Sequence, residues 1–383
     1  MPWKEATKMS ERRELITKWA SGLYKVTDLA EEFGVSRPTV YEWIRRYDEG
    51  GGESALSDRR SVPGSCPHRT PEAIAKEIVK AKRQHPFWGP AKLINLLRLD
   101  HPEIAWPSAS TAGAILDREG LVTHRPHRRR GVVLNAGALK ATESGEMMTA
   151  DHKGQFRLGN TRYTFPVTIN DPVSRYIYSI AGKTSTSYQE ARPAFERVFR
   201  QYGVPHFMGS DNGGPFSCSQ ALAGLSLLSV WWIKLGITPV RIHPGCPWEN
   251  GVHERMHKTL KAETARPPAR NAREQQKRFD SFRTEFNTVR PHDGIGGRRP
   301  IELLKRCQRP YPRRLVEHDY AGHYETRSVR PTGEIRWKGG FVFLSQTLAG
   351  ERVGMVELAD GVWGVSFHHI ELGRYDERTR HIT

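Results

Sequence analysis

The order of apolar runs between residues 143 and 265 restricts the possible folds of this chain more than any other feature. Strand-length runs rich in β-branched residues come first, and helix-length runs then alternate with further strands. We expect five strands: one that carries Asp151, two at 161–170 and 174–181, one that ends at Asp211 and one at 238–242. We expect helices at 188–202 and 220–235, and a last helix after Pro247. This order is typical of an α/β domain with a mixed sheet.

Three acidic segments lie where these elements end or begin. Asp151 belongs to the first strand, Asp211 ends the fourth, and Glu254 lies on the last helix. Carboxylates gathered from distant segments usually hold hard divalent cations, because Mg²⁺ prefers oxygen ligands and binds through a few carboxylates plus substrate phosphates. We therefore expect Asp151, Asp211 and Glu254 to be catalytic residues that hold two Mg²⁺ ions for phosphoryl transfer.

Four histidines lie close to these acids in the sequence. No pair of them has a spacing typical of a zinc site, so we expect phosphate or solvent contacts from them. They are His152, His243, His253 and His257.

The charge balance indicates which phosphates are involved. Lys plus Arg number 59 against 42 Asp plus Glu, a net charge of +17. Such a surplus attracts a polyanion and releases its counterions, so double-stranded DNA is the expected partner. Lys258 and Lys261 share one helix face with Glu254 and are expected to contact the DNA backbone, with a salt-bridged surface helix as the alternative.

Cysteine spacing and hydropathy limit the compartment. Cys66, Cys218, Cys246 and Cys307 form no C-x-x-C pair, which argues against a zinc knuckle or a disulfide framework. The longest apolar run, 221–233, is shorter than the about 20 residues needed to span a bilayer. We expect that run to be a buried helix, and the protein to be cytoplasmic without a membrane partner.

The first 52 residues have the pattern of a helix-turn-helix. Helices are expected at 10–21, 27–33 and 37–47, with Gly34 stopping the second and Ser36 capping the third. An ordinary three-helix unit is the alternative. In the DNA-binding interpretation, the side chains that point toward a major groove are Arg37, Thr39, Tyr41, Arg45 and Arg46.

The remaining segments complete a multidomain chain. A second helix-turn-helix unit, of the plain or the winged type, is expected at 68–123, although a purely structural helical unit is equally compatible. Arg128, Arg129 and Arg130 lie in a basic linker at 124–142 that is expected to follow a phosphate backbone, with a solvated charge run as the alternative. The α/β domain at 143–265 is followed by a helical connector at 266–310 and a small β-barrel at 311–376.

Three motifs together resemble a known family. Strand-borne Asp151, the Ser-Asp-Asn-Gly-Gly segment around Asp211 and the Asn-Gly-Val-His-Glu segment ending at Glu254 are similar to the DDE transposases of the retroviral-integrase superfamily. The similarity is greatest to transposases of bacterial insertion sequences and extends over nearly the whole chain. It implies an RNase-H-like core between all-α helix-turn-helix units and a small C-terminal β domain.

The same resemblance implies an activity. Enzymes of this family cleave the ends of a mobile element and transfer the 3′-hydroxyl into target DNA with Mg²⁺ or Mn²⁺. The helix-turn-helix units would bind terminal inverted repeats, two or more subunits would hold the ends together, and the protein would lie at the bacterial nucleoid. A catalytically silent DNA-binding regulator of the same fold and a nuclease that only cuts are the alternatives.

The third acid is a choice between two glutamates. The usual spacing of the family favours Glu249, which is separated from Asp211 by 37 residues, over Glu254, which is separated from it by 42. Local context favours Glu254, because it precedes the basic helix face as the glutamate of the family does. A longer apolar helix at 220–235 would explain the wider gap, and we therefore assign Glu254.

Overall fold

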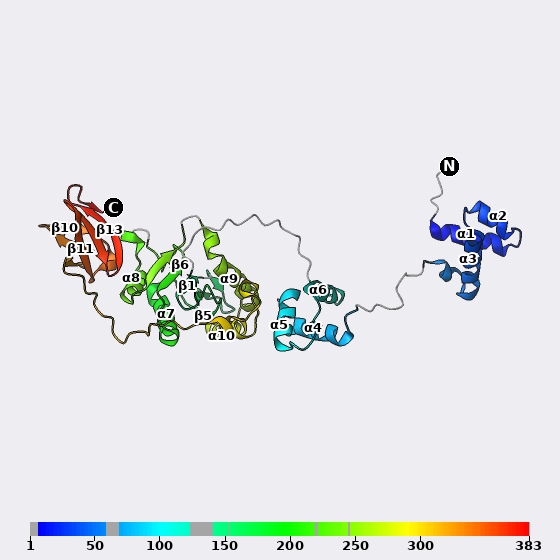
Figure 1. Cartoon of the computed structure of the whole chain (residues 1–383), viewed down its shortest axis with the longest axis horizontal. Helices are drawn as coiled ribbons and strands as arrows, with labels where there is room; N and C mark the ends of the chain where they lie inside the picture. Colours follow the sequence, from blue (N-terminus) through cyan, green and yellow to red (C-terminus); the bar gives the residue numbers. More distant parts are fainter. Residues whose placement is uncertain are drawn as a thin grey trace. The chain divides into compact units, whose positions relative to one another are not determined.

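The computed structural model describes residues 7–58, 69–122, 141–152, 154–218, 221–243 and 246–382. The chain divides into two compact units, Met1–Arg69 and Thr70–Thr383, and each is described by itself (Figure 1). The domain boundaries expected from the sequence are finer than this division and remain predictions. The basic linker with Arg128, Arg129 and Arg130 lies outside the described residues.

The first unit contains the three helices expected for a helix-turn-helix. Gly34 separates the second helix from the third with φ of +63°, a left-handed conformation that residues with a Cβ rarely adopt. Leu15, Leu29 and Val40 are buried where the helices meet, and the Ser36 side chain caps the third helix. The helices are α1 (Lys8–Ala20), α2 (Val26–Glu32) and α3 (Arg37–Glu49).

A second group of three helices begins the second unit: α4 (Glu72–Gln84), α5 (Pro90–Asp100) and α6 (Ala109–Arg118). Their apolar faces bury Trp88 and Leu93, and no strand occurs within residues 69–122, so this described segment has no wing. His85 Nδ1 lies 3.0 Å from Glu285 Oε1 of helix α10 (Ala272–Thr288), and the Arg290 guanidinium lies over the Trp88 ring. The group therefore packs against the end of α10.

A five-stranded mixed sheet forms the centre of the second unit, as the sequence predicts. Its strand order is β5-β4-β1-β6-β7, in which β4 is antiparallel to β1 and β5, while β6 is parallel to β1 and β7. A short hairpin, β2 (Phe156–Arg157) and β3 (Tyr163–Thr164), precedes β4. The strands of the sheet are β1 (Met147–His152), β4 (Val167–Asn170), β5 (Ile177–Ala181), β6 (Phe207–Ser210) and β7 (Thr238–Arg241).

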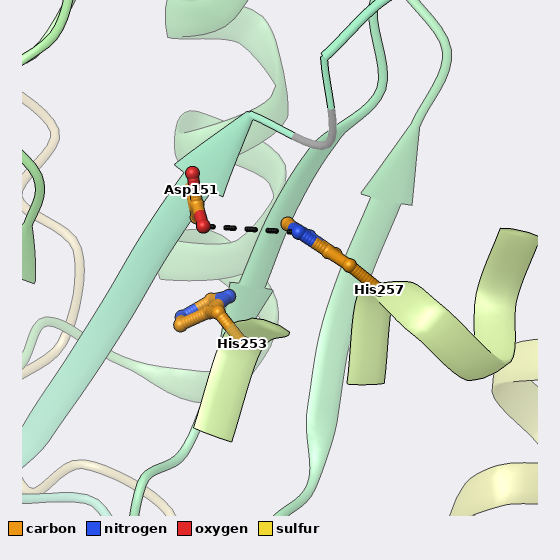
Figure 2. A group of neighbouring side chains, drawn as sticks. All are labelled: Asp151, His253 and His257. Atoms are coloured by element: carbon orange, nitrogen blue, oxygen red, sulfur yellow. Dashed lines mark ion pairs between the residues drawn. The ribbon is translucent and has the colours of Figure 1, made fainter. Parts of the chain in front are cut away.

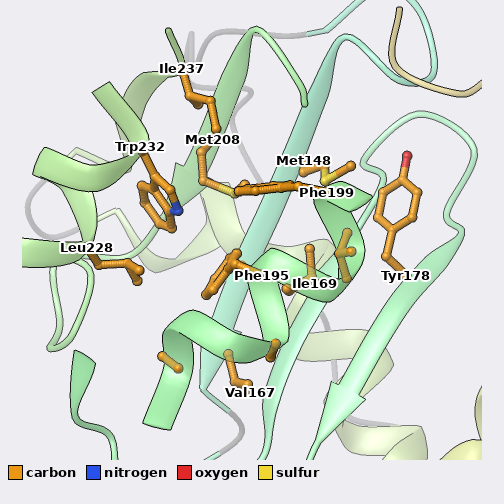
Figure 3. Close-up of a cluster of buried hydrophobic side chains, with 14 of the residues drawn as sticks. Met148, Val167, Ile169, Tyr178, Phe195, Phe199, Met208, Leu228, Trp232 and Ile237 are labelled. Carbon is orange, nitrogen blue, oxygen red and sulfur yellow. The ribbon is translucent and has the colours of Figure 1, made fainter. Parts of the chain in front are cut away.

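Helices cover both faces of this sheet. On one face lie α7 (Tyr188–Tyr202) and α8 (Leu227–Lys234), and Figure 3 shows Phe195, Phe199 and Trp232 of these helices beside Met148 and Met208 of the sheet. On the opposite face lie α9 (Gly251–Thr264) and α10, whose apolar side chains pack against β5. The sheet is thus the middle of three layers.

Alternation along β1 and β4 creates a polar row on the α9 side. Successive side chains of a strand point to opposite faces. Met148 and Ala150 of β1, and the apolar residues of β4, point into the core formed with α7 and α8. The polar residues that alternate with these apolar ones form hydrogen bonds to side chains of α9 or to Asn250, the residue before α9. These polar residues are Thr149, Asp151, Thr168 and Asn170.

The helix expected at 220–235 is shorter in the structure. α8 begins only at Leu227, because Ser226 caps it and Gly224 before it adopts φ of +64°. A 3₁₀ turn, Leu222–Gly224, takes the place of the expected first helical turns. The apolar run does become buried, so its burial was predicted correctly and its helical start was wrong.

The C-terminal β domain is present, but its described strands do not close into the expected barrel. They form an open antiparallel sheet of order β14-β13-β12-β11-β8 and a separate β9-β10 hairpin over a shared apolar core. In the described part of the chain, no helix is both long and apolar enough to span a membrane. The strands are β8 (Glu325–Ser328), β9 (Glu334–Trp337), β10 (Gly340–Phe343), β11 (Arg352–Ala359), β12 (Val362–Phe367), β13 (Ile370–Asp376) and β14 (His381–Ile382).

Candidate active site

Asp151 and Asp211 lie at the carboxyl ends of neighbouring parallel strands. Ala150 of β1 pairs with Ser210 of β6, so Asp151 is the next residue of β1 and Asp211 directly follows the end of β6. Burial raises the pKa of the Asp211 carboxyl, while a hydrogen bond from the Gly213 backbone N–H, 3.1 Å from Asp211 Oδ1, opposes that rise. The strand order therefore places the two acids at the same edge of the sheet.

Asp151 is held by two side chains from the α9 region. Asn250, at the N-terminal end of α9, donates a 2.7 Å hydrogen bond from Nδ2 to Asp151 Oδ2. His257 Nδ1 lies 3.7 Å from the same oxygen, and Figure 2 shows this ring directed at the carboxylate. Asp151 is 8% exposed, so these contacts fix a carboxylate that faces little water.

Thr168 connects this carboxylate to the histidines of α9. Its hydroxyl lies 3.0 Å from the Asp151 carbonyl oxygen, 2.8 Å from His257 Nε2 and 3.3 Å from His253 Nδ1. His253 Nε2 lies 2.8 Å from the Thr149 hydroxyl on the other side of the ring. The polar row and α9 are thus joined by a continuous buried network, which we call the Thr168 network (Thr149, Asp151, Thr168, His253 and His257).

The histidines of this network differ from the expected solvent or phosphate contacts. His253 and His257 are 2% and 6% exposed, and burial lowers the pKa of His253 to about 4, so its ring is neutral at pH 7. One potential ligand atom from each of Asp151, His253 and His257 lies within 4.8 Å of the others. Both nitrogens of His253 already have hydrogen-bond partners, which favours a supporting role over metal ligation.

The two candidate glutamates have different surroundings. Glu249, in the 3₁₀ turn before α9, accepts hydrogen bonds from the His243 backbone N–H at 2.9 Å and lies 2.8 Å from His243 Nδ1. These bonds lower the pKa of Glu249. Glu254 lies in the first turn of α9 with an exposed side chain, and it is not in the group with Asp151, His253 and His257. Glu249 is therefore committed to its own turn, and Glu254 is available.

The expected DNA-contacting side chains that the structure describes lie mostly at the surface. On α3, Arg37, Tyr41 and Arg45 are exposed, whereas Thr39 and Arg46 are half-buried. Lys258 and Lys261 of α9 are both exposed, as their spacing predicts. Arg46 lies over the Trp43 ring and pairs with Glu42 at 2.9 Å, so part of its bonding capacity is used within α3.

Sequence reasoning did not identify Asn250 or Thr168. A usable signal existed for both. Asn250, His253 and His257 follow the i, i+3, i+7 spacing of one helix face, and Thr168 is a polar residue inside an otherwise apolar strand. What the sequence lacks is the pairing of β1 with β4, which places Thr168 opposite Asp151.

Three parts of the chain match known protein families. Residues 235–300 match the integrase core domain, residues 11–64 a helix-turn-helix domain and residues 39–116 a homeodomain-like domain. The Gag-Pol polyprotein of gibbon ape leukemia virus is 23% identical over 242 residues, which are 57% of this chain and 13% of the relative. That of woolly monkey sarcoma virus is 24% identical over 245 residues, with the same shares. The chain thus spans 13% of the length of these relatives.

Solved structures similar to the chain are also integrases, at low identity. The HTLV-2 integrase catalytic core domain in complex with magnesium has a TM-score of 0.34 and 14% identity, over 43% of this chain and 100% of that one. The simian T-cell lymphotropic virus intasome in complex with PP2A regulatory subunit B56 gamma has a TM-score of 0.38 and 13% identity, over 78% of this chain and 97% of that one.

The structure places Asp151 and Asp211 at the carboxyl ends of neighbouring strands in a mixed sheet. An integrase core and helix-turn-helix domains accompany that arrangement here. These matches support a DDE transposase or integrase of the RNase-H-like superfamily.

Proposed function

We propose that this chain is a DDE transposase that binds the terminal inverted repeats of a mobile element, cleaves the DNA at the element ends and joins them to target DNA. The observation that carries the proposal is the position of Asp151 and Asp211 at the ends of β1 and β6, next to the helix that bears Glu254. The integrase core and helix-turn-helix matches support it. A homodimer or larger homo-oligomer would hold two ends together.

Asp151, Asp211 and Glu254 offer the oxygen donors that suit Mg²⁺ or Mn²⁺. Two such ions would neutralise charge on the phosphodiester and activate the attacking oxygen. Asn250 and His257 position the Asp151 carboxylate. Lys258 and Lys261, one and two helical turns beyond Glu254, are placed to contact the DNA backbone.

Glu254 is the better third acid on physical grounds. Glu249 bonds both the backbone and the ring of His243, and binding a metal would cost those bonds. Glu254 has an exposed side chain, and no salt bridge to it occurs among the described residues. Its recruitment to a metal therefore breaks no ion pair among the described residues.

Activity is tested with labelled duplexes that carry the ends of the element encoding the chain. Purified full-length protein is incubated with these duplexes, an unlabelled target and Mg²⁺ or Mn²⁺, and the products are separated by size. We expect nicked ends and joined products, and neither product when the metal is chelated. DNA binding without either product would indicate a silent regulator, and nicking without joining would indicate a nuclease.

Four variants assign the acids. Asp151→Asn, Asp211→Asn and Glu254→Gln are expected to lower product formation by at least about 100-fold, because each removes a charged metal ligand. Glu249→Gln is the matched control, and it should keep activity within about tenfold because only the turn bonded to His243 is altered. Loss of activity in Glu249→Gln with activity retained in Glu254→Gln would reverse our assignment.

A further inference from the structure

A positively charged cavity lies beside the acids, at the start of α9. It has a volume of about 300 Å³, at the lower end of the range for small-ligand sites. Four basic side chains line it, one from α5, one from the turn after β4, one from α9 and one just beyond α10. We call it the cation pocket, and its basic residues are Lys92, Arg175, Arg255 and Arg290.

Charge in the cation pocket is poorly balanced. Arg290 pairs with Glu263 at 2.9 Å, and Asp293 is the one acidic residue of the pocket lining. For Lys92, Arg175 and Arg255, no carboxylate of the described residues lies within 4.0 Å. Lys92 and Arg175 are half-buried and Arg290 is buried, whereas Arg255 is exposed. Gathering buried and half-buried cations costs free energy unless an anion joins them.

The pKa directions agree with this crowding. Burial lowers the pKa of Lys92, and the nearby Arg290 and Arg255 lower it further, while Asp293 and Glu263 oppose the shift. Burial also lowers the pKa of Arg175, again with a contribution from Arg255, while Asp171 opposes the shift. Arg175 in addition adopts φ of +65°, a left-handed conformation that is strained for a residue with a Cβ. The fold thus accepts both electrostatic and backbone cost to hold these cations here.

The cation pocket adjoins the candidate active site. Arg255 directly follows Glu254 on α9, and Asn170 both lines the pocket and bonds His253 of the Thr168 network. An anion in the pocket would therefore lie next to the DNA held by the acids. In a chain of net charge +17, the anion available at that place is a phosphate of the DNA itself.

We propose that the cation pocket binds one backbone phosphate of the DNA substrate, separate from the phosphate attacked at the acids. The inference deepens the proposed function and rests on it. Lys92 belongs to the α4–α6 group, so this phosphate would connect that group to the catalytic core through the DNA. The pocket would then fix the position of the strand relative to Asp151 and Asp211.

Binding is tested in full-length protein carrying Asp151→Asn, without metal, so that no DNA is consumed. Fluorescence anisotropy with a labelled element-end duplex gives the affinity over a series of salt concentrations. We expect Lys92→Gln and Arg175→Gln each to weaken binding by about tenfold. Each should also reduce the salt slope, which is the slope of the logarithm of the binding constant against the logarithm of the salt concentration, by up to about one. The double variant should reduce the slope by no more than about one, because both cations contact the same phosphate.

Matched variants separate this effect from general loss of charge or of folding. Arg200→Gln removes a positive charge already paired with Glu196, and it should leave both affinity and slope unchanged. Lys92→Arg keeps the charge and should bind like the parent protein. Unchanged affinity and slope in Lys92→Gln and Arg175→Gln would overturn the proposal, as would an equal loss in Arg200→Gln.

A free phosphate ion is the other source of the same chemistry. Inorganic phosphate is therefore added to the parent protein and to the double variant, against chloride at equal ionic strength. Release of DNA by phosphate from the parent protein but not from the double variant would support a phosphate site. If the parent protein binds inorganic phosphate tightly and the variants leave the affinity for DNA unaltered, the assignment of the pocket to DNA is overturned. Failure of the wild-type protein to nick or join DNA would count against the proposed function alone, since the binding test needs no catalysis.

Discussion

At the scale of single residues, Thr168 determines how the Asp151 region is held together. Its hydroxyl has one proton and three partners, of which the Asp151 carbonyl oxygen only accepts. Because that proton goes to the carbonyl oxygen, His257 must donate from Nε2 to Thr168. His257 Nδ1 is then the atom that faces the Asp151 carboxylate. One threonine thus sets the ring orientation beside a candidate catalytic acid.

Thr168→Val is expected to destabilise the second unit by about 1–3 kcal/mol, because it keeps the shape of the side chain but leaves buried polar partners without a hydrogen bond. Thr168 is 0% exposed, so water does not replace the lost partner. Urea unfolding monitored by tryptophan fluorescence measures the change. Thr288→Val is the control, since that hydroxyl lies on the exposed surface of α10, and a similar loss in both variants would contradict a special role of Thr168.

At the scale of elements, α3 is the best-defined candidate for the helix that enters a major groove. Ser36 caps its start through a hydrogen bond from the Thr39 backbone N–H. Tyr41 is 61% exposed although it is aromatic, which is typical of a side chain that acts at an interface. Arg45 pairs with Glu42 at 2.6 Å, so Arg37 and Tyr41 are the contacts that α3 presents without an ion pair among the described residues.

Ser36→Ala is expected to cost the first unit about 1 kcal/mol through loss of the cap on α3. Affinity for element-end DNA should fall as well, because fraying of the first turn displaces Arg37. Unfolding and anisotropy measurements on the full chain report the two effects. Ser21→Ala, at the exposed end of α1, is the comparison, and equal effects of the two substitutions would argue against a role for the cap.

Some elements follow from local sequence and others do not. The helices α1, α2, α3 and α7 match their expected ranges within a few residues, because capping residues and apolar spacing act within each segment. The start of α8 was missed because Gly224 and Ser226 interrupt an apolar run that looks continuous. The closure of the C-terminal sheet was missed because closure depends on pairing between strands distant in sequence.

At the scale of the whole molecule, the division after Arg69 separates the unit that contains α1 to α3 from the unit that contains the mixed sheet. A chain of residues 70–383 keeps all the acids and is expected to nick and join element ends at raised DNA concentration. Its affinity should be lower and its salt slope shallower than those of the full chain, because the contacts of α3 are gone. Equal affinity of the two proteins in a binding titration would show that the first unit does not contact DNA.

The sequence alone determined the mixed sheet, the helical N-terminal units and the β domain, while the catalytic role of Asp151 and Asp211 remains a prediction. These depend on periodicity, on capping and on short motifs, all of which are local properties of the chain. The choice of the third acid remains a prediction, although the bonds of Glu249 to His243 now favour Glu254 on physical grounds.

Only the tertiary structure decided which polar residues surround Asp151 and which cations share a cavity. Pairing of β1 with β4 brings Thr168 to Asp151, and packing of α9 on the sheet brings Asn250 and His257 to the same carboxylate. The cation pocket likewise joins Lys92 to arginines more than 80 residues away in the chain. Such contacts depend on strand pairing and helix packing over long sequence separations, which local patterns do not specify.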